Sequence, residues 1–104
     1  MANMMKLMQQ AAKMQKDLEK VQGELANKTV EFSSGGGAVK VVASGDGVVK
    51  SIKIDPAVIN PADAGLLEDM VLASVNGALK TAKDMSSKEM SKIAADMGLP
   101  GLGM

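Results

Sequence analysis

The 104-residue sequence contains no cysteine, histidine, tryptophan, tyrosine or arginine, and Phe32 is its single aromatic residue. Without cysteine the chain forms neither disulfides nor thiolate metal sites, which fits a reducing cytoplasm. A nucleophilic serine such as Ser44 or Ser74 has only lysine or a carboxylate as a base, and no G-x-S-x-G or S-x-x-K motif surrounds any serine. We therefore expect a protein that is not an enzyme and takes no cofactor and no small-molecule substrate.

Long apolar runs are also missing. No segment approaches the roughly 18 consecutive apolar residues that a membrane span requires, and Asn3 and Lys6 interrupt the apolar start of the chain. The acidic residues Asp63, Glu68 and Asp69 fit the start of a helix better than a metal site, because adjacent helical residues point to different faces. We expect a cytoplasmic protein with no membrane partner and no metal.

Lysine is the only cationic side chain, and its twelve copies balance twelve aspartates and glutamates, so the formal net charge is zero. Arginine is the side chain whose planar fork pairs with guanine or phosphate in a bidentate way. Any contact with nucleic acid must therefore depend on lysine point charges, with asparagine, glutamine, serine and threonine as further donors.

The clearest pattern is a helical one near the N-terminus, which predicts a helix at about residues 3–26 within an N-terminal segment 1–26. Its apolar positions alternate in steps of three and four over three heptads, as in a coiled coil. These positions are Met4, Leu7, Ala11, Met14, Leu18, Val21 and Leu25.

After Asn27 the period changes to two, and residues 29–33, 39–43 and 50–54 alternate as strands do. The glycine-rich segments 33–37 and 45–47 separate them and suit tight reversals. Neither segment completes a phosphate-binding loop or a dinucleotide fingerprint. The segment 28–54 is therefore predicted to be a three-stranded antiparallel meander.

A second, long helix is predicted over residues 61–97. Asp55-Pro56 and Asn60-Pro61 each place a capping side chain before a proline suited to a first helical position. The apolar stripe slips at residues 86–87, which suggests a bend or a change of face there. Residues 98–104, rich in glycine, are expected to form a loose tail.

Helices of about 24 and 34 residues would extend about 36 and 50 Å, much farther than three short strands. A projecting helix with an apolar stripe needs a cover, which favours a homodimer. Alternatively, the two helices cover each other within one chain, and both arrangements can hold in part. The fold class expected is α+β: helix, β-meander, long helix.

The lysines of the first helix form a stripe. Lys6, Lys13 and Lys20 are spaced by seven and follow one flank of the helix beside the apolar seam, with Lys16 on an outer face. Three of these four have an acid three or four residues on, which would neutralise them within the helix. In the second helix Lys80 precedes Asp84 by four residues, and Lys92 follows Glu89 by three. The pattern alone is compatible with solvated helix faces and with a phosphate-binding surface.

Several stretches, in their order and spacing, resemble the YbaB/EbfC family of bacterial nucleoid-associated proteins. They are residues 4–11 (MMKLMQQA), 14–15 (MQ), 37–41 (GAVKV), 52–56 (IKIDP), 67–71 (LEDMV), 76–79 (NGAL) and 97–101 (MGLPG). The resemblance covers nearly the whole chain as a single domain. It implies a tweezer-like homodimer, located in the cytoplasm at the nucleoid, whose helical arms contact DNA and alter or protect it.

Carried onto this sequence, the resemblance points to lysines of both helices as DNA-binding residues. They are Lys6, Lys13, Lys16, Lys20, Lys80, Lys83, Lys88 and Lys92. The leading hypothesis is a dimer that binds the DNA backbone by displacing counterions. Two rivals remain. One is a protein-protein adaptor dimer whose methionine-rich seam receives another protein's helix, and the other is a subunit that lends its fold to a catalytic partner.

Overall fold

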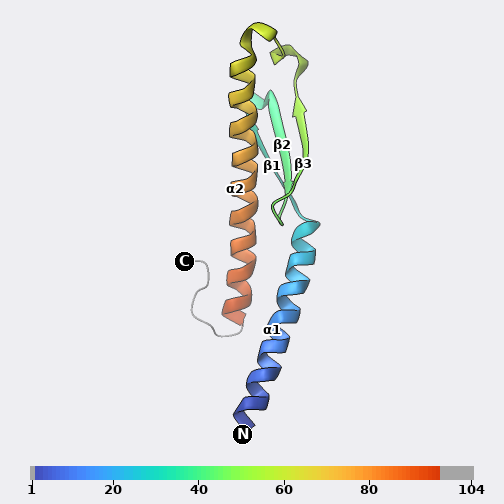
Figure 1. Ribbon diagram of the computed structural model, residues 1–104, viewed down its shortest axis with the longest axis vertical. Helices are drawn as coiled ribbons and strands as arrows, with labels where there is room; N and C mark the ends of the chain where they lie inside the picture. Colours follow the sequence, from blue (N-terminus) through green and yellow to red (C-terminus); the bar gives the residue numbers. More distant parts are fainter. Residues whose placement is uncertain (1, 97–104) are drawn as a thin grey trace.

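The computed structural model describes residues 2–96 and contains two long helices and one sheet (Figure 1). Helix α1 (Ala2–Ala26) leads into strands β1 (Thr29–Ser34), β2 (Val39–Ser44) and β3 (Val49–Ile54), and helix α2 (Ala64–Asp96) follows the sheet. This order confirms the predicted α+β class of helix, meander and long helix. None of the helices in the described part is long and apolar enough to cross a membrane.

The three strands form an antiparallel sheet in the order β1-β2-β3, so every strand pairs with its neighbour in sequence. The reversal after β1 is a short 3-10 turn, Gly35–Gly37, in which all three glycines have positive φ. Side chains with a Cβ rarely adopt this conformation, which explains the glycine run. The pairing of β2 with β3 shifts register between Val42 and Ala43.

Helix α2 covers one face of the sheet, mainly over β1 and β2 (Figure 1). The core between these two layers consists of Val39, Val41 and Ala43 from β2 and of Ala78 and Ala82 from α2, all fully buried. Alanine on the helix allows a close approach to the valines of the central strand. The core is therefore thin, as expected for a single domain of this length.

Hydrogen bonds of two serine hydroxyl groups also connect the sheet to α2, beside this apolar core. The Ser34 hydroxyl donates to the Met70 carbonyl at 2.8 Å, and the Ser34 and Ser74 hydroxyl oxygens lie 2.6 Å apart. Ser74 is fully buried, and its hydroxyl also lies 3.4 Å from the Val39 carbonyl. Buried polar groups are costly unless they are paired, and these are paired across the layers.

Proline turns precede α2. Asp55 and Asn60 accept hydrogen bonds from the backbone N–H of Ala57 and Ala62, at 2.9 and 3.0 Å. The predicted capping residues therefore cap short 3-10 turns, Pro56–Val58 and Pro61–Asp63, and the α-helix itself begins at Ala64.

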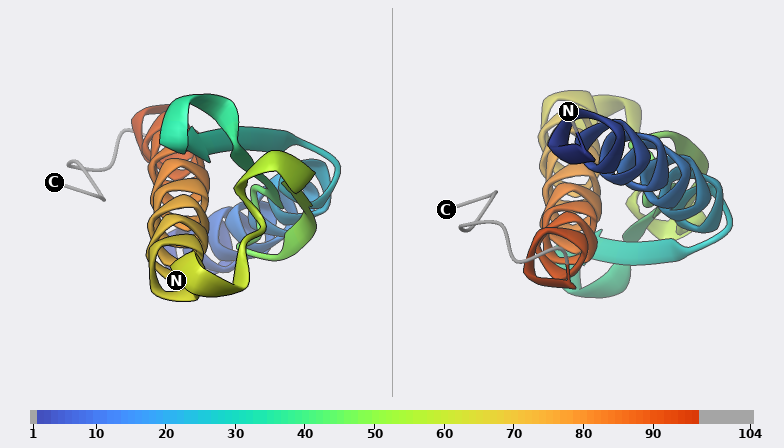
Figure 2. Two further views of the ribbon diagram at one scale, coloured as in Figure 1. Left: turned by 90° about the horizontal axis from the view of Figure 1, so that it is seen from above. Right: turned by 90° about the horizontal axis from the view of Figure 1, so that it is seen from below.

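Within residues 2–96, helix α1 contacts the other elements only through its second half. Leu25 is buried, Leu18 and Val21 are half-buried, and residues 3–13 are exposed on every side. The Gly45 N–H donates to the carbonyl oxygens of Leu25 and Lys28, both at 2.9 Å, which fixes the end of α1 against the turn after β2. Seen along the long axis, α1 runs at an angle to α2 (Figure 2). The second half of the apolar seam is thus covered within the chain, and the cover of the exposed half by a second copy stays a prediction.

Helix α2 runs without interruption through the predicted slip at residues 86–87. Its buried face changes partner there: Ala78 and Ala82 pack on the sheet, whereas Ile93 lies with Asp17, Val21 and other residues of α1. Residue 1, the predicted helix end at residue 97 and the predicted tail 98–104 lie outside the described residues.

Candidate nucleic-acid interface

The four lysines of α1 are all exposed: Lys6, Lys13, Lys16 and Lys20. An α-helix turns about 100° per residue, so these positions fall within a sector about 80° wide. This sector lies on the side away from the apolar seam, so the predicted position of the stripe beside the seam was wrong. Contact of the seam with α2 or with another helix therefore leaves this lysine stripe free to face a ligand.

Charge is separated along α1. Residues 2–16 contain Lys6, Lys13 and Lys16 and no acidic side chain, whereas residues 17–26 contain Asp17, Glu19 and Glu24 against Lys20 alone. The cationic part coincides with the exposed half that projects beyond the last described turn of α2 (Figure 1). This projecting half, residues 2–16, is called the arm tip below.

Lys20 differs from the lysines of the arm tip. It lies in a shallow groove between the helices together with the carboxylates of Asp17, Glu24 and Asp96. These negative charges reduce the attraction of an anionic ligand to Lys20. Lys6 and Lys13 are separated from this acidic groove along the helix.

Ion pairs in the structure are few. Among residues 2–96, pairs within 4.0 Å are formed only by Glu89, with Lys28 at 3.7 Å and with Lys92 at 3.5 Å. The sequence spacing indicated the Lys92 pair. It also indicated pairs of Lys13 with Asp17, Lys16 with Glu19 and Lys20 with Glu24, which do not come within this distance. The charges of the arm tip are thus not neutralised by contact within the described chain.

The lysines of α2 lie on the other arm. Lys80, Lys83, Lys88 and Lys92 are exposed, and of these only Lys92 is in an ion pair with another residue of the described range 2–96. On the helix they spread over a sector about 180° wide, so they form no single stripe. Within one chain the structure does not bring them together with the arm tip into one site.

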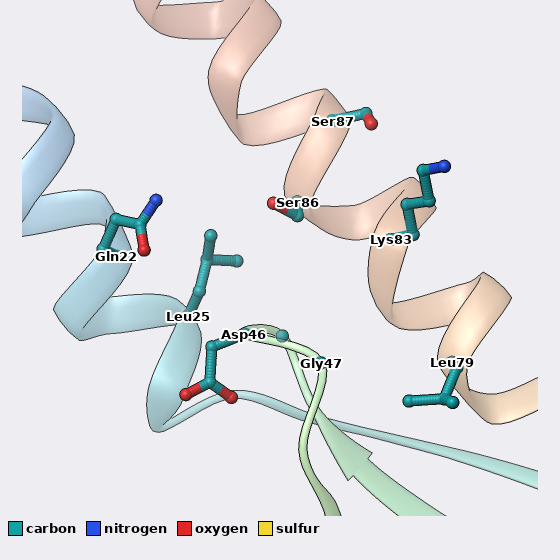
Figure 3. A pocket seen from close by; sticks show the side chains of 9 residues that line it. Gln22, Leu25, Asp46, Gly47, Leu79, Lys83, Ser86 and Ser87 are labelled. Carbon is teal, nitrogen blue, oxygen red and sulfur yellow. The ribbon is translucent and has the colours of Figure 1, made fainter. Parts of the chain in front are cut away.

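Lys83 lines an open crevice where the end of α1, the turn after β2 and α2 meet (Figure 3). The crevice has a volume of about 430 Å³, and Ser86 points into the gap opposite Gln22 and Leu25. Its one carboxylate, Asp46, accepts a hydrogen bond from Ser44. Within residues 2–96, no three histidine, cysteine or acidic side chains are placed to hold a metal ion.

Four lysines were not selected from the sequence: Lys28, Lys40, Lys50 and Lys53. The last three are exposed residues of the sheet. Lys40 alternates with Val39 and Val41, and Lys53 with Ile52 and Ile54, so the strand period already placed both on the face opposite to the core. The partner of Lys28 is Glu89 on α2, which is far away in sequence and gives no local signal.

Comparisons with known proteins agree with this architecture. A model of the YbaB/EbfC DNA-binding family matches residues 1–97. A nucleoid-associated protein of Pelotomaculum thermopropionicum is 51% identical over 100 residues, covering 96% of this chain and 95% of that protein. One of Acetivibrio thermocellus is 52% identical over 101 residues, covering 96% and 89%. The crystal structure of an uncharacterized protein from Helicobacter pylori shares the fold, with a TM-score of 0.71 at 20% identity over 88% of this chain and 91% of that one. The resemblance predicted from the sequence is confirmed, and the chain belongs to the YbaB/EbfC DNA-binding family.

Proposed function

We propose that the protein is a nucleoid-associated DNA-binding protein that acts as a homodimer and holds duplex DNA mainly by its phosphates. The observation that carries the proposal is the arm tip, which presents three exposed lysines and no acidic side chain. Family membership and the names of the relatives support DNA as the ligand and the nucleoid as the location.

The contacts are expected to be to phosphates rather than to bases. A lysine ammonium is a point charge that attracts phosphate from many directions, whereas guanine is read best by the planar fork of arginine, which this chain lacks. Binding through lysines releases counterions and depends little on sequence. Lys6, Lys13 and Lys16 are the principal contacts in this proposal, and Lys80, Lys83, Lys88, Lys92 and Lys20 are secondary.

A second copy is expected to cover an apolar groove beside the sheet. Helix α2 lies mainly over β1 and β2, so the inner side of β3 is left partly open. The groove is lined by Ile54, Leu67, Glu68, Val71, Leu72 and Val75. Leu72, at 60% exposure, and Ile52, at 45%, are unusually open for large apolar side chains.

The exposed area is consistent with a missing partner. The chain exposes 7372 Å², whereas a compact monomer of this mass exposes about 5,500 Å². The excess is larger than the roughly 800 Å² that each partner buries in a standard interface. With two copies joined at the groove, two arm tips act on one duplex, and such a clamp would bend DNA or shield it.

Substitution of single lysines tests the DNA contact. We expect Lys6→Gln to weaken binding to every duplex sequence alike and to lower the slope of log affinity against log salt by about one. Lys28→Gln removes the same charge from the base of the arm, where the lysine pairs with Glu89, and serves as the matched control. Equal slopes for Lys6→Gln and the wild type would contradict the proposal, as would an effect on one duplex sequence only.

Two leucines of nearly equal exposure test the dimer. Leu72 lines the groove and Leu66, at 61% exposure, does not. Leu72→Glu is expected to give a monomer in sedimentation equilibrium and to weaken DNA binding, whereas Leu66→Glu stays dimeric. A wild-type chain that sediments as a folded monomer at micromolar concentration would refute the dimer.

A protein-protein adaptor is the second candidate function, and one observation favours it. Met4, Met5, Leu7 and Met8 on the arm tip are 64–70% exposed, which suits a surface that receives an apolar helix. Nuclease treatment separates the candidates. An adaptor keeps its protein partners after nucleic acid is digested, whereas partners held through DNA are lost.

A further inference from the structure

The face of the sheet opposite α2 is open and carries a row of polar side chains across all three strands. In the register of the sheet, Ser33 is the partner of Lys40, and Lys40 is the partner of Lys53. All three residues are exposed. Lys40 and Lys53 are called the sheet lysine pair below.

These two lysines are held close together by the backbone. The Asp55 N–H donates to the Ala38 carbonyl at 2.8 Å, two residues along the same antiparallel ladder. Hydrogen-bonded positions alternate, so Lys40 and Lys53 occupy another such position, with Cα atoms about 5.5 Å apart. Like charges placed directly opposite each other on one face destabilise a sheet.

No acidic side chain within the described residues compensates this pair, since neither lysine has an ion pair within 4.0 Å. Two acids lie on the same face: Glu31, which is paired in register with Val42 and is therefore diagonal to Lys40, and Asp55, two residues after Lys53. Asp55 follows β3, and its carboxylate accepts the Ala57 N–H. The two ammonium groups thus face each other without an ion pair, on a surface that no element among residues 2–96 covers.

We propose that the sheet lysine pair is a second phosphate-binding surface, which takes a stretch of duplex DNA separate from the one on the arm tip. A phosphate between the two ammonium groups removes their mutual repulsion, and the Ser33 hydroxyl is a further donor in the same row. The inference rests on the proposed function, because it assumes that duplex DNA is the ligand.

The position in the fold separates the two surfaces. The pair lies at the end of the sheet beside the Gly35–Gly37 turn, whereas α1 leaves from the opposite end and points away (Figure 1). The chain is 72 Å long, and a helix of 25 residues accounts for about 37 Å of that length. A second copy is a poor occupant, because symmetric contact through this face adds more lysines to those already opposed.

A short duplex tests the proposal. About 8 base pairs span only about 27 Å, which is less than the roughly 30 Å that the helical and strand rise place between Lys16 and the sheet lysine pair, so one such duplex cannot reach both surfaces. Three variants are compared with the wild type at equal protein concentration. The arm variant is Lys6→Gln/Lys13→Gln/Lys16→Gln, and the sheet variant is Lys40→Gln/Lys53→Gln. The control, Lys28→Gln/Lys50→Gln, loses the same charge as the sheet variant outside the row. All of these positions are exposed, and thermal melts check that each variant folds.

The readouts are the number of duplexes bound per chain and the salt dependence of binding. We expect the sheet variant to bind one duplex fewer per chain than the wild type and the control. The arm variant should bind one duplex through Lys40 and Lys53, and its affinity for this duplex should fall about 12-fold between 50 and 200 mM salt. A variant that combines the arm and sheet substitutions should not bind this duplex. Acetylation of Lys40 and Lys53 should slow when duplex is present.

An unchanged number of duplexes and an unchanged salt slope in the sheet variant would overturn this inference while leaving the arm proposal intact. Full binding by the arm variant, lost only with the sheet substitutions, would instead refute the arm tip as a contact and retain the sheet surface.

Discussion

Gly77 on α2 lies directly against the ring of Phe32, and its replacement by alanine tests the packing of helix on sheet. A Cβ at residue 77 would stand 2.4 Å from two ring carbons of Phe32 and 2.7 Å from a third. Ordinary contact between carbon atoms is about 3.5–4.0 Å, so the ring would have to move by about 1 Å. Phe32 is in register with Val41, which is fully buried, and therefore the ring can only shift outward, toward solvent.

The expected change in the free energy of unfolding for Gly77→Ala is the balance of two opposing effects. Alanine is favoured over glycine inside a helix by about 1 kcal/mol. Overpacking costs about 1–3 kcal/mol, and an outward shift of a half-exposed ring also loses part of its burial. We expect Gly77→Ala to destabilise the protein by about 1–2 kcal/mol, which lowers the melting temperature by roughly 5–10 °C for a chain of this size.

Two other helical glycines are the matched controls. Gly23 in α1 and Gly65 in α2 have no atom within 4 Å of an added Cβ, and neither has positive φ. Alanine there should raise stability by about 0.5–1 kcal/mol through helix propensity alone. The assay is urea unfolding followed by far-UV circular dichroism at one fixed protein concentration, because self-association makes stability depend on concentration.

A double-mutant cycle isolates the contact. In a Phe32→Leu background the ring is absent, so Gly77→Ala should cost at least about 1 kcal/mol less than in the wild type. Stabilisation by Gly77→Ala equal to that by Gly23→Ala would refute the close approach of Phe32 to α2.

Three further substitutions test other contacts. Ser74→Ala removes one of the two partners of the Ser34 hydroxyl and should cost about 1 kcal/mol in urea unfolding; no loss would mean that the hydroxyl pair does not join helix and sheet. Gly45→Ala places a Cβ 2.9 Å from the Leu25 carbonyl oxygen, and should speed hydrogen exchange in the second half of α1 while α2 keeps its protection. Glu89→Gln removes two partly exposed ion pairs and should change stability by less than about 1 kcal/mol; a larger loss would show that these pairs hold the helices together.

The elements themselves were predictable from the sequence because their patterns are local. The three-four spacing from Met4 to Leu25 gives α1, and the alternation around Val39, Val41 and Ile52 gives the strands. Which half of α1 is covered was not predictable, because Met4 and Leu7 have the same three-residue spacing as Leu18 and Val21. Only the position of α2 in three dimensions decides it.

The candidate interface was predictable to a smaller degree. The lysine stripe of α1 follows from helix geometry, but the expected pairs of Lys13, Lys16 and Lys20 with nearby acids do not form. Exposed side chains gain little from pairing, so sequence spacing alone is a weak guide. The opposition of Lys40 and Lys53 depends on the register of β2 and β3, which a strand pattern cannot specify when the connecting turn is irregular.

Helix α2 follows the sheet in the chain, and this order has a consequence for biosynthesis. Each strand pairs with its sequence neighbour through a short turn, so the sheet can form soon after it leaves the ribosome. The apolar side chains of β2 stay open to water until Ser74, Ala78 and Ala82 emerge behind them. The nascent chain thus exposes an apolar surface while the residues between β2 and the middle of α2 are synthesised. Stop codons within α2 should therefore yield chains that aggregate or are degraded, and no shorter functional protein.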